Sequence, residues 1–540
     1  MNLSQALLQL RRQQFTGVSA GRWYLLLPAV VVSVGVVLPL VYLLVRAFEA
    51  EGANLVEIVF RPKNLRLLGN TALLVVSVVA VDTLLAVPLA WLTSRTPIKG
   101  RRFFTLLGVL PLAIPSYVMA YVLLSLGGDY GAFAHLFGTS IPQLSGYWGA
   151  LIALSLYTFP YLFLNLRAAL FSVDPALEES ARSLGYRPWG VFYRVVIPQL
   201  RPAFTAGGLL VGLHVLGDFG VVSLMRYETF SYALYVQYEA SFDRVYVAWL
   251  ALMLLILAGG LLYTEARLLR GLRLDRAGGS VSHKGSDIQP LLGIWRGVAY
   301  LFLAILALIS VVVPIVTVSL WMVKGMNISL MKDLFNALLS SLLASVPAAV
   351  LSACFALPLA YMGVRYPSPF SRLMERVAYI GYAIPPLAYA LSLIFFVLGA
   401  ISGFYQTIWV LIYAYTLHFL AEAIGPVRSA LYHASPRLEE AARGLGYSAL
   451  TAFFKATFPL LVRGLTVSVA LVFLAVMKEL PITFLLSPPG YETLATNVWG
   501  YTEEAMFAEA APYALVLLLF SALFVWVLLI QERSRDGVPA

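Results

Sequence analysis

Twelve stretches of about 20 mostly apolar residues run along the chain, and they constrain its fold more than any other feature. A helix needs about 20 apolar residues to cross a bilayer, and in lipid its backbone groups bond within the helix. The expected spans are 23–47, 67–93, 103–126, 147–170, 202–225, 245–267, 294–322, 334–362, 373–399, 405–431, 463–486 and 509–530. We therefore expect an all-α polytopic membrane protein of about 12 transmembrane helices.

The composition argues against most soluble classes of protein. Of the 540 residues, 60% are hydrophobic and only 12% are charged, whereas a soluble domain carries about 25% charged residues. The single cysteine, Cys354, excludes a disulfide framework and a cysteine-based metal cluster. The first apolar stretch is too long for a signal peptide and lacks a cleavage site. A soluble enzyme, a disordered chain and a nucleic-acid-binding protein are poor interpretations, and membrane lipid is the expected surrounding.

The basic residues predict an orientation. If the N-terminus is cytoplasmic and the spans alternate, most of the 37 Lys and Arg residues fall on the cytoplasmic side. The residues on the opposite side are Arg46, Arg61, Lys63, Arg66, Arg226, Arg244, Lys324, Lys332 and Lys478. This bias follows the positive-inside rule and places both termini in the cytoplasm. It also explains the net charge of +10 without a nucleic-acid partner.

The two halves of the sequence resemble each other. Residues 86–91 (AVPLAW) recur 270 positions later as 356–361 (ALPLAY), and 178–186 (EESARSLGY) recur 261 positions later as 439–447 (EEAARGLGY). Six expected spans precede the basic segment 268–293 and six follow it, so the halves are parallel repeats. The expected organisation is an N-terminal arm, a first repeat, a linker, a second repeat and a tail, at 1–22, 23–267, 268–293, 294–531 and 532–540.

The best-matched segments are two loops on the expected cytoplasmic side, 174–198 and 435–459. Each opens with an N-cap residue before proline and an acidic pair in the first turns, as Asp174-Pro175 with Glu178-Glu179 and as Ser435-Pro436 with Glu439-Glu440. Gly185 or Gly446 then ends the short helix. Because loops normally diverge, we interpret each copy as a helix that docks in a groove on a cytoplasmic partner. The alternative is a surface hairpin left over from duplication.

These loops resemble the EAA loop of permeases in binding-protein-dependent ABC importers. The matching positions are Glu179, Ala181, Gly185 and Pro198 in the first loop and Glu440, Ala442, Gly446 and Pro459 in the second. Ser180 replaces the usual alanine, and Ala456 and Phe458 replace the usual aliphatic residues. The likeness covers nearly the whole chain and is closest to fused two-repeat permeases of the ferric-iron type. The segments 227–230 (YETF), 478–481 (KELP) and 491–496 (YETLAT) add to it.

The resemblance implies a type I ABC importer permease in a bacterial inner membrane. Two copies of a separate cytoplasmic ATPase would hold the two loops through the matching residues together with Glu178 and Glu439. A periplasmic binding protein would deliver the substrate, and ATP-driven closure of the ATPases would switch the permease between inward-open and outward-open states. The sequence has no Gly-Lys dipeptide and hence no Walker A motif. No catalytic residue and no cofactor is therefore expected in this chain.

Ionisable residues inside spans are costly, and each is by default a functional hypothesis. Asp218 and Glu479 lie 261 positions apart, so they occupy equivalent places in the two repeats and are candidates for the translocation path. The alternative is that each caps a break in its helix. His214 and His418 each precede a carboxylate by four positions, which is more typical of a buried pair than of a metal site. No metal site is predicted.

The substrate is not fixed by the sequence. Ferric iron is favoured by the resemblance, while thiamine, phosphonate or another small solute fits the same architecture. An ion-coupled secondary transporter also has twelve spans in two parallel repeats. That class has no use for a cytoplasmic docking helix that occurs twice, so we favour the importer.

Overall fold

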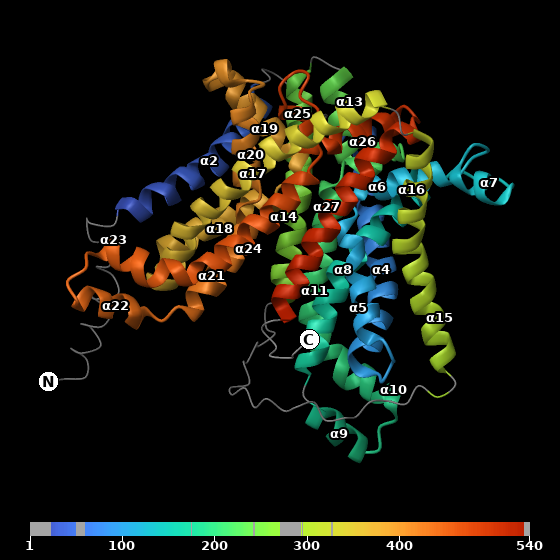
Figure 1. The fold of residues 1–540 in the computed structure, drawn as a ribbon, viewed down its shortest axis with the longest axis horizontal. Helices are drawn as coiled ribbons and strands as arrows, with labels where there is room; N and C mark the ends of the chain where they lie inside the picture. The colour runs from blue at the N-terminus through green and yellow to red at the C-terminus, as the bar shows by residue number, and fades with distance from the viewer. Residues whose placement is uncertain are drawn as a thin grey trace. The chain divides into compact units, whose positions relative to one another are not determined.

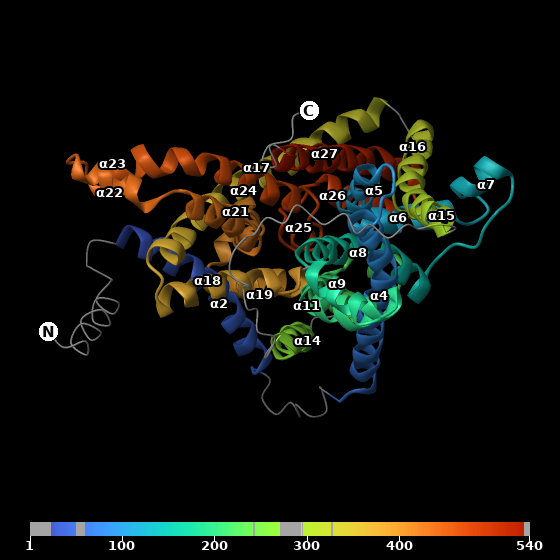
Figure 2. The ribbon, with the colours of Figure 1, turned by 90° about the horizontal axis from the view of Figure 1, so that it is seen from below.

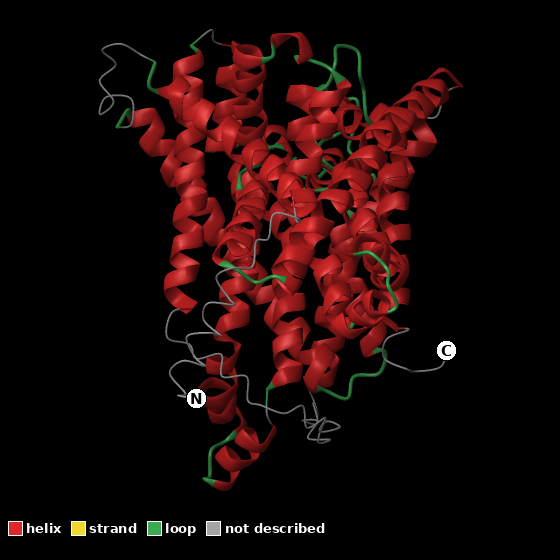
Figure 3. Cartoon of the chain, turned by 90° about the vertical axis from the view of Figure 1, so that its left-hand side faces the viewer, coloured by secondary structure: helices red, strands yellow, loops and turns green. Residues whose placement is uncertain are grey.

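The computed structural model describes residues 23–49, 60–173, 175–240, 243–269, 293, 295–325 and 328–533. Every regular element within these ranges is a helix (Figure 3). The first half of the sequence forms α2 (Trp23–Ala47), α4 (Pro62–Arg95), α5 (Arg101–Val109), η1 (Leu110–Ala113), α6 (Ser116–Leu126), α7 (Ala132–Phe137), α8 (Gly146–Ser172), α9 (Pro175–Ser183), α10 (Pro188–Val191), η2 (Phe192–Val196), α11 (Ile197–Gly217), α12 (Gly220–Leu224), α13 (Phe230–Ala240) and α14 (Arg244–Leu269).

The second half follows the same order, but the span that matches α8 is divided into two helices and a short 3₁₀ turn takes the place of α7. Its elements are α15 (Trp295–Ala307), η3 (Leu308–Val312), α16 (Val313–Gly325), α17 (Ile328–Arg365), α18 (Pro369–Ala383), α19 (Pro386–Ala400), η4 (Ser402–Phe404), α20 (Ile408–His418), α21 (Leu420–His433), α22 (Pro436–Gly444), α23 (Ala449–Ala452), η5 (Phe453–Thr457), α24 (Phe458–Met477), α25 (Pro481–Leu486), α26 (Leu494–Glu503) and α27 (Phe507–Arg533). Only η4, a single 3₁₀ turn of three residues, stands where the first half has the six-residue α7.

The membrane spans are partly continuous and partly broken. Among the described residues, 8 helices are long and apolar enough to cross a membrane, and three bent helix pairs raise the number to 11. Part of α27 is a further, shorter apolar helix. These elements confirm the expected all-α polytopic fold of about 12 helices.

Several expected spans are not single helices. The chain bends by 93° between α5 and α6, by 107° between α18 and α19, and by 50° between α20 and α21. The first two bends fall at Ile114-Pro115 and Ile384-Pro385, where each isoleucine is extended, with ψ of 117° and 129°. A residue before proline is driven away from helical geometry by the proline ring. The spans expected over 103–126, 373–399 and 405–431 are thus present, each as a bent pair of helices and not as one continuous helix.

Two further expected spans, 202–225 and 463–486, are also interrupted. α11 ends at Gly217 before α12, and α24 ends at Met477 before α25. Both breaks contain one of the intramembrane carboxylates, Asp218 or Glu479, so the break and the charge are one duplicated feature.

The described residues divide into two compact units, which do not coincide with the two halves of the sequence. In one unit, α2 packs against α18 and α19, and α21 packs along α24 (Figure 1). In the other, α4 packs along α8, α11 packs against both, and α16 contacts α6. The first helix of each sequence half therefore packs on the core of the other half.

α4 and α17 are the longest helices, with 34 and 38 residues. At 1.5 Å per residue each is about 50 Å long or more, which exceeds a hydrocarbon core of about 30 Å. Their ends therefore extend beyond the apolar layer, and one end of each contacts a loop described next.

Candidate coupling loops

Each of the two matched loops forms a small helical hairpin at the end of a long span. α9, α10 and η2 form the first hairpin and lead into α11, while α22, α23 and η5 form the second and lead into α24. Figure 1 shows α9 and α10 beyond the ends of α5 and α8. The N-cap expected at Ser435 is confirmed, because its side chain accepts a hydrogen bond from the Arg437 N–H at 3.4 Å. The N-cap expected at Asp174 lies outside the described residues.

Gly185 and Gly446 end the first helix of each hairpin in the left-handed conformation, with φ of +86° and +88°. Tyr186 N–H donates to Ala181 O at 3.2 Å, and Tyr447 N–H donates to Ala442 O at 3.3 Å. These bonds, with those from the glycine N–H groups to Arg182 and Arg443, form a Schellman cap in each copy. The glycines thus set the sharp turn that separates the two arms of the hairpin.

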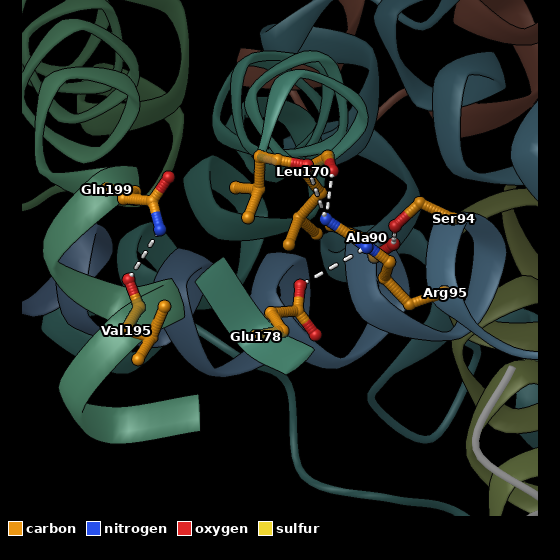
Figure 4. Close-up of polar contacts among 8 residues, drawn as sticks. Ala90, Ser94, Arg95, Leu170, Glu178, Val195 and Gln199 are labelled. Atoms are coloured by element: carbon orange, nitrogen blue, oxygen red, sulfur yellow. Dashed lines mark hydrogen bonds and ion pairs between the residues drawn. The ribbon is translucent and has the colours of Figure 1, made fainter. Parts of the chain in front are cut away.

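An arginine at the end of each long helix holds the chain that enters the hairpin, and Figure 4 shows the first copy. Arg95 Nη2 donates to Leu170 O at 2.7 Å and to Val173 O at 3.4 Å. In the second copy Arg365 Nη2 donates to Ala434 O. Arg95 and Arg365 are 270 positions apart, so the duplication has preserved this attachment.

The first glutamate of each acidic pair points inward. Glu178 is only 7% exposed, and its Oε1 lies 3.3 Å from Arg95 Nη1 (Figure 4). Glu439 instead accepts hydrogen bonds from Tyr361 Oη at 2.8 and 3.1 Å and from Thr457 Oγ1 at 3.1 Å. The same acid is therefore held by an ion pair in one hairpin and by two hydroxyl groups in the other.

An aromatic contact fastens the second arm of each hairpin to the same long helix. The rings of Trp91 and Phe192 meet edge to face at 5.0 Å, and those of Tyr361 and Phe453 meet at 5.4 Å. Both phenylalanines begin a π-helical turn, η2 or η5. Pro198 and Pro459 follow these turns by two residues, and because proline has no N–H to donate, it favours such a widened turn upstream.

The outer side of each hairpin is apolar and exposed. Leu184 and Leu445, next to the cap glycines, are 78% and 81% exposed. Other exposed apolar residues occur at matching positions in the two copies: Leu177 and Leu438, Tyr186 and Tyr447, Trp189 and Leu450, and Tyr193 and Phe454. Glu179 and Glu440 are exposed on the first helix. We call these apolar residues, with the two glutamates, the coupling faces.

A further contact stabilises each coupling face from within. The Arg194 guanidinium lies 5.0 Å from the centre of the Tyr186 ring, and the Lys455 ammonium lies 4.5 Å from that of Tyr447. The residues of the second pair lie 261 positions after those of the first, so the two contacts are equivalent. Ala181 is buried and Ala442 is half-buried against the hairpin, whereas the glutamate two positions earlier is exposed. In each EAA-type pattern the last alanine thus faces the hairpin, and the glutamate faces outward.

The sequence interpretation assigned Glu178, Glu179, Glu439 and Glu440 to one group, and the structure separates them. It also missed Arg95, Arg365, Trp91, Tyr361 and Thr457, which attach the hairpins. A signal was present, because residues 86–91 and 356–361 belong to the matched segments. However, these residues contact the loops across a long separation in sequence, and no local sequence pattern indicates such a contact.

Asp218 and Glu479 each cap the short helix that follows their break. Asp218 Oδ1 accepts from Val221 N–H at 2.8 Å. Glu479 accepts from Ile482 N–H at 2.9 and 3.0 Å and from Thr483 N–H at 3.0 Å. Glu479 is 7% exposed, whereas Asp218 is half-buried. The capping alternative raised from the sequence therefore describes their contacts in this structure.

The histidines of the spans contact aromatic rings. His214 lies 4.3 Å from the Tyr161 ring centre, and His418 lies 5.4 Å from that of Tyr389. Among the described residues no group of three or more His, Cys, Asp or Glu side chains is placed to hold a metal ion.

A helical membrane protein with two sequence repeats, each of which carries a matched helical hairpin at the end of a long span, has the architecture of two-repeat transport permeases. Within that class, the chain belongs to the family described as "Binding-protein-dependent transport system inner membrane component", whose model matches residues 83–273 and 345–536. The two matches confirm the duplication. The chain is thus a multi-pass inner-membrane permease of an ABC importer, and the alternative of a secondary transporter is not supported.

Individual relatives agree with this family. The chain is 32% identical over 509 residues to the Fe(3+)-transport system permease protein FbpB 2 of Haemophilus influenzae, a match that covers 94% of this chain and 98% of the relative. It is 27% identical over 235 residues to the sulfate transport system permease protein CysW of Escherichia coli, covering 42% of this chain and 81% of the relative. A probable molybdenum ABC transporter permease protein of Haloferax volcanii is 35% identical over 170 residues, covering 30% of this chain and 62% of the relative.

Proposed function

We propose that this permease carries ferric iron, delivered by a periplasmic binding protein, into the cytoplasm by alternating access. The observation that carries the proposal is the likeness to the Fe(3+)-transport permease, which extends over both repeats and nearly the full length of both chains. The sulfate and molybdenum relatives match only one repeat's length of this chain. Thiamine, phosphonate or another small solute remains the alternative cargo of the same architecture.

The energy comes from two copies of a separate cytoplasmic ABC ATPase, one on each coupling face. Two matched faces of exposed leucine and aromatic side chains support this stoichiometry, because apolar surface of this kind is typical of helix-in-groove docking. The exposed Glu179 and Glu440 supply a charged contact on each face. The attachments to α4 and α17 would pass the movement of each ATPase to the spans.

The orientation follows from the same assignment. If the coupling faces meet a cytoplasmic ATPase, then the N-terminal arm 1–22, the linker 268–293 and the tail 532–540 share that side. The excess of basic residues in these segments supports this orientation. The repeats at 23–267 and 294–531 then carry the membrane spans.

The substrate is tested by uptake into proteoliposomes that contain this permease, its ATPase and a binding protein loaded with ferric iron. We expect ATP-dependent accumulation of iron and none with a non-hydrolysable ATP analogue. Accumulation of sulfate or molybdate in place of iron would refute the cargo and leave the permease assignment intact. Accumulation that follows a proton or sodium gradient without ATP would refute the mechanism.

For the translocation path, we propose that Asp218 borders it and that Glu479 acts first as a helix cap. Both carboxylates cap a helix, but Asp218 is half-buried whereas Glu479 is buried, and this difference in exposure supports the distinction. Asparagine keeps the oxygen that caps Val221 but removes the negative charge.

Asp218→Asn is therefore expected to lower iron uptake several-fold at unchanged ATPase co-purification and unchanged thermal stability. Glu479→Gln, which keeps an accepting oxygen, is the matched variant and should reduce uptake less. Wild-type uptake in the Asp218→Asn, Glu479→Gln double variant would exclude both residues from the path.

A further inference from the structure

One connection of the first repeat is much longer than its equivalent in the second. Between α6 and α8 the chain extends over 127–145 and forms α7, whereas the matching connection between α19 and α20 is the much shorter segment 401–407. In both Figure 1 and Figure 2, α7 stands outside α16 at the edge of its unit. The duplication therefore does not account for α7, and neither does coupling to the ATPase.

The base of this connection is fixed to the spans. Gly128 N–H donates to Ile141 O at 2.8 Å, and Gln143 Nε2 donates to Leu124 O at 3.2 Å, so the two ends of the connection are joined. Trp321 Nε1 donates to Ser125 O at 3.4 Å and ties α16 to the end of α6. These hydrogen bonds hold the connection that contains α7 beside α16.

A cavity of about 270 Å³ lies between α7 and α16. It is lined by Ala132, His135, Leu136, Leu320, Trp321 and Lys324. The Lys324 ammonium lies 5.3 Å from the centre of the Trp321 ring, and the His135 ring meets the same tryptophan edge to face at 6.1 Å. No carboxylate lines the cavity, and no described acidic side chain forms an ion pair with Lys324. The lining therefore combines two nitrogen-bearing basic side chains, His135 and Lys324, with apolar ones.

The position of the cavity along α16 corresponds to a membrane surface. Lys324 lies in the last turn of the apolar run 295–325, where a basic residue marks the headgroup layer. Below it, Ile315 and Val316 on α16 are exposed, as lipid-facing side chains are. α7 itself exposes Leu136 and Phe137, at 49% and 66%. Apolar side chains on a short helix outside the bundle are stable at the interface between headgroups and acyl chains, and unfavourable in water.

We propose that this cavity binds the headgroup of an anionic phospholipid and that α7 lies in the headgroup layer as a lateral anchor of the permease. The phosphate accepts hydrogen bonds from the Lys324 ammonium and from a His135 ring N–H. The glycerol lies against Trp321 and Leu136, and the acyl chains run along the exposed side of α16. The proposal needs a membrane protein but neither iron nor an ATPase, so it stands or fails separately from the proposed function.

Native mass spectrometry of the full-length permease, purified in a mild detergent and titrated with phosphatidylglycerol, tests the site. The wild-type protein is expected to bind at least one more phosphatidylglycerol than the Lys324→Gln, His135→Gln double variant, with a tenfold or greater loss of affinity at that site. Lys332→Gln is the matched control, because Lys332 is exposed and does not line the cavity. It should bind as the wild type does.

Three further results decide the proposal. Lys324→Arg should retain the lipid, and its failure to do so while Lys332→Gln binds normally would contradict a role for the charge. Equal binding of phosphatidylcholine and phosphatidylglycerol by the wild type would show that the cavity does not select an anionic headgroup. Displacement of the lipid by millimolar inorganic phosphate would identify a site for a free anion, and would overturn the lipid assignment.

Discussion

Replacing both Gly185 and Gly446 by valine is expected to abolish ATP-driven uptake and ATPase co-purification while the permease still inserts in the membrane. Both glycines have φ near +87°, at +86° and +88°, where a side chain on an L-residue costs about 1–2 kcal/mol, and a β-branched one is a stronger outlier. A Cβ at either glycine would meet no atom within 4 Å. The cost therefore comes from the backbone alone, and it is relieved by opening the Schellman cap and turning the coupling face away.

Gly185→Asn with Gly446→Asn is the matched control. Asparagine adopts the left-handed conformation more readily than other residues with a side chain, and it occurs at this position of helix caps. Because the space around both glycines is open, the larger side chain should be accepted, with most of the uptake and ATPase binding retained. If the valine variant co-purified with the ATPase as well as the wild type, the hairpins would not be the docking sites. If the asparagine variant failed as completely as valine, crowding by the partner would replace backbone geometry as the explanation.

The helical hairpins of the two matched loops were predictable because their signals are local. The acidic pairs, the glycines and the prolines lie within 25 residues of one another in each copy, and the repeated spacing made them visible. The breaks in the spans were not predictable in the same way. Val87-Pro88 lies inside the continuous α4, whereas Ile114-Pro115 separates α6 from η1, although both prolines follow a β-branched residue. Packing against neighbouring helices decides which proline breaks a helix, and the sequence does not display that packing.

The inward glutamates show a second limit of the sequence. Glu178 and Glu439 begin nearly identical segments, yet their carboxylates have different partners. These partners are residues that lie far away in the sequence. Tyr361 and Thr457 offer hydroxyl groups to Glu439. The equivalent residues in the first repeat, Trp91 and Val196, have no hydroxyl group, and there the acid is paired with Arg95 instead. Two positions on different helices thus differ between the repeats, and only their contact with the acid in space connects them.

This difference predicts opposite tolerance to the same substitution. Glu178→Gln removes the negative charge of the ion pair and leaves the Arg95 guanidinium without its counter-charge at a mostly buried site, which costs about 1–3 kcal/mol or more. Glu439→Gln keeps a carbonyl oxygen that accepts from Tyr361 or Thr457, so we expect a cost below about 1 kcal/mol. The first variant should lose tenfold or more of its uptake, and the second should stay within about threefold of wild type, since 1.4 kcal/mol corresponds to about a tenfold change.

The ratio of substrate moved to ATP hydrolysed distinguishes a misplaced hairpin from a general loss of stability. A hairpin that is folded but detached from its long helix allows ATP hydrolysis without transport and lowers this ratio. Adding Trp91→Tyr and Val196→Thr to Glu178→Gln transfers the hydroxyl donors of the second repeat to the first, and should restore this ratio toward that of the wild type. Glu179→Gln, on the exposed side of the same helix, is the control for the coupling face: it should weaken ATPase co-purification and gain nothing from the transferred hydroxyls. Equal loss of coupling in Glu178→Gln and Glu439→Gln, without rescue, would mean that the inward carboxylates act through their charge alone and that the differing contacts of the two hairpins have no functional consequence.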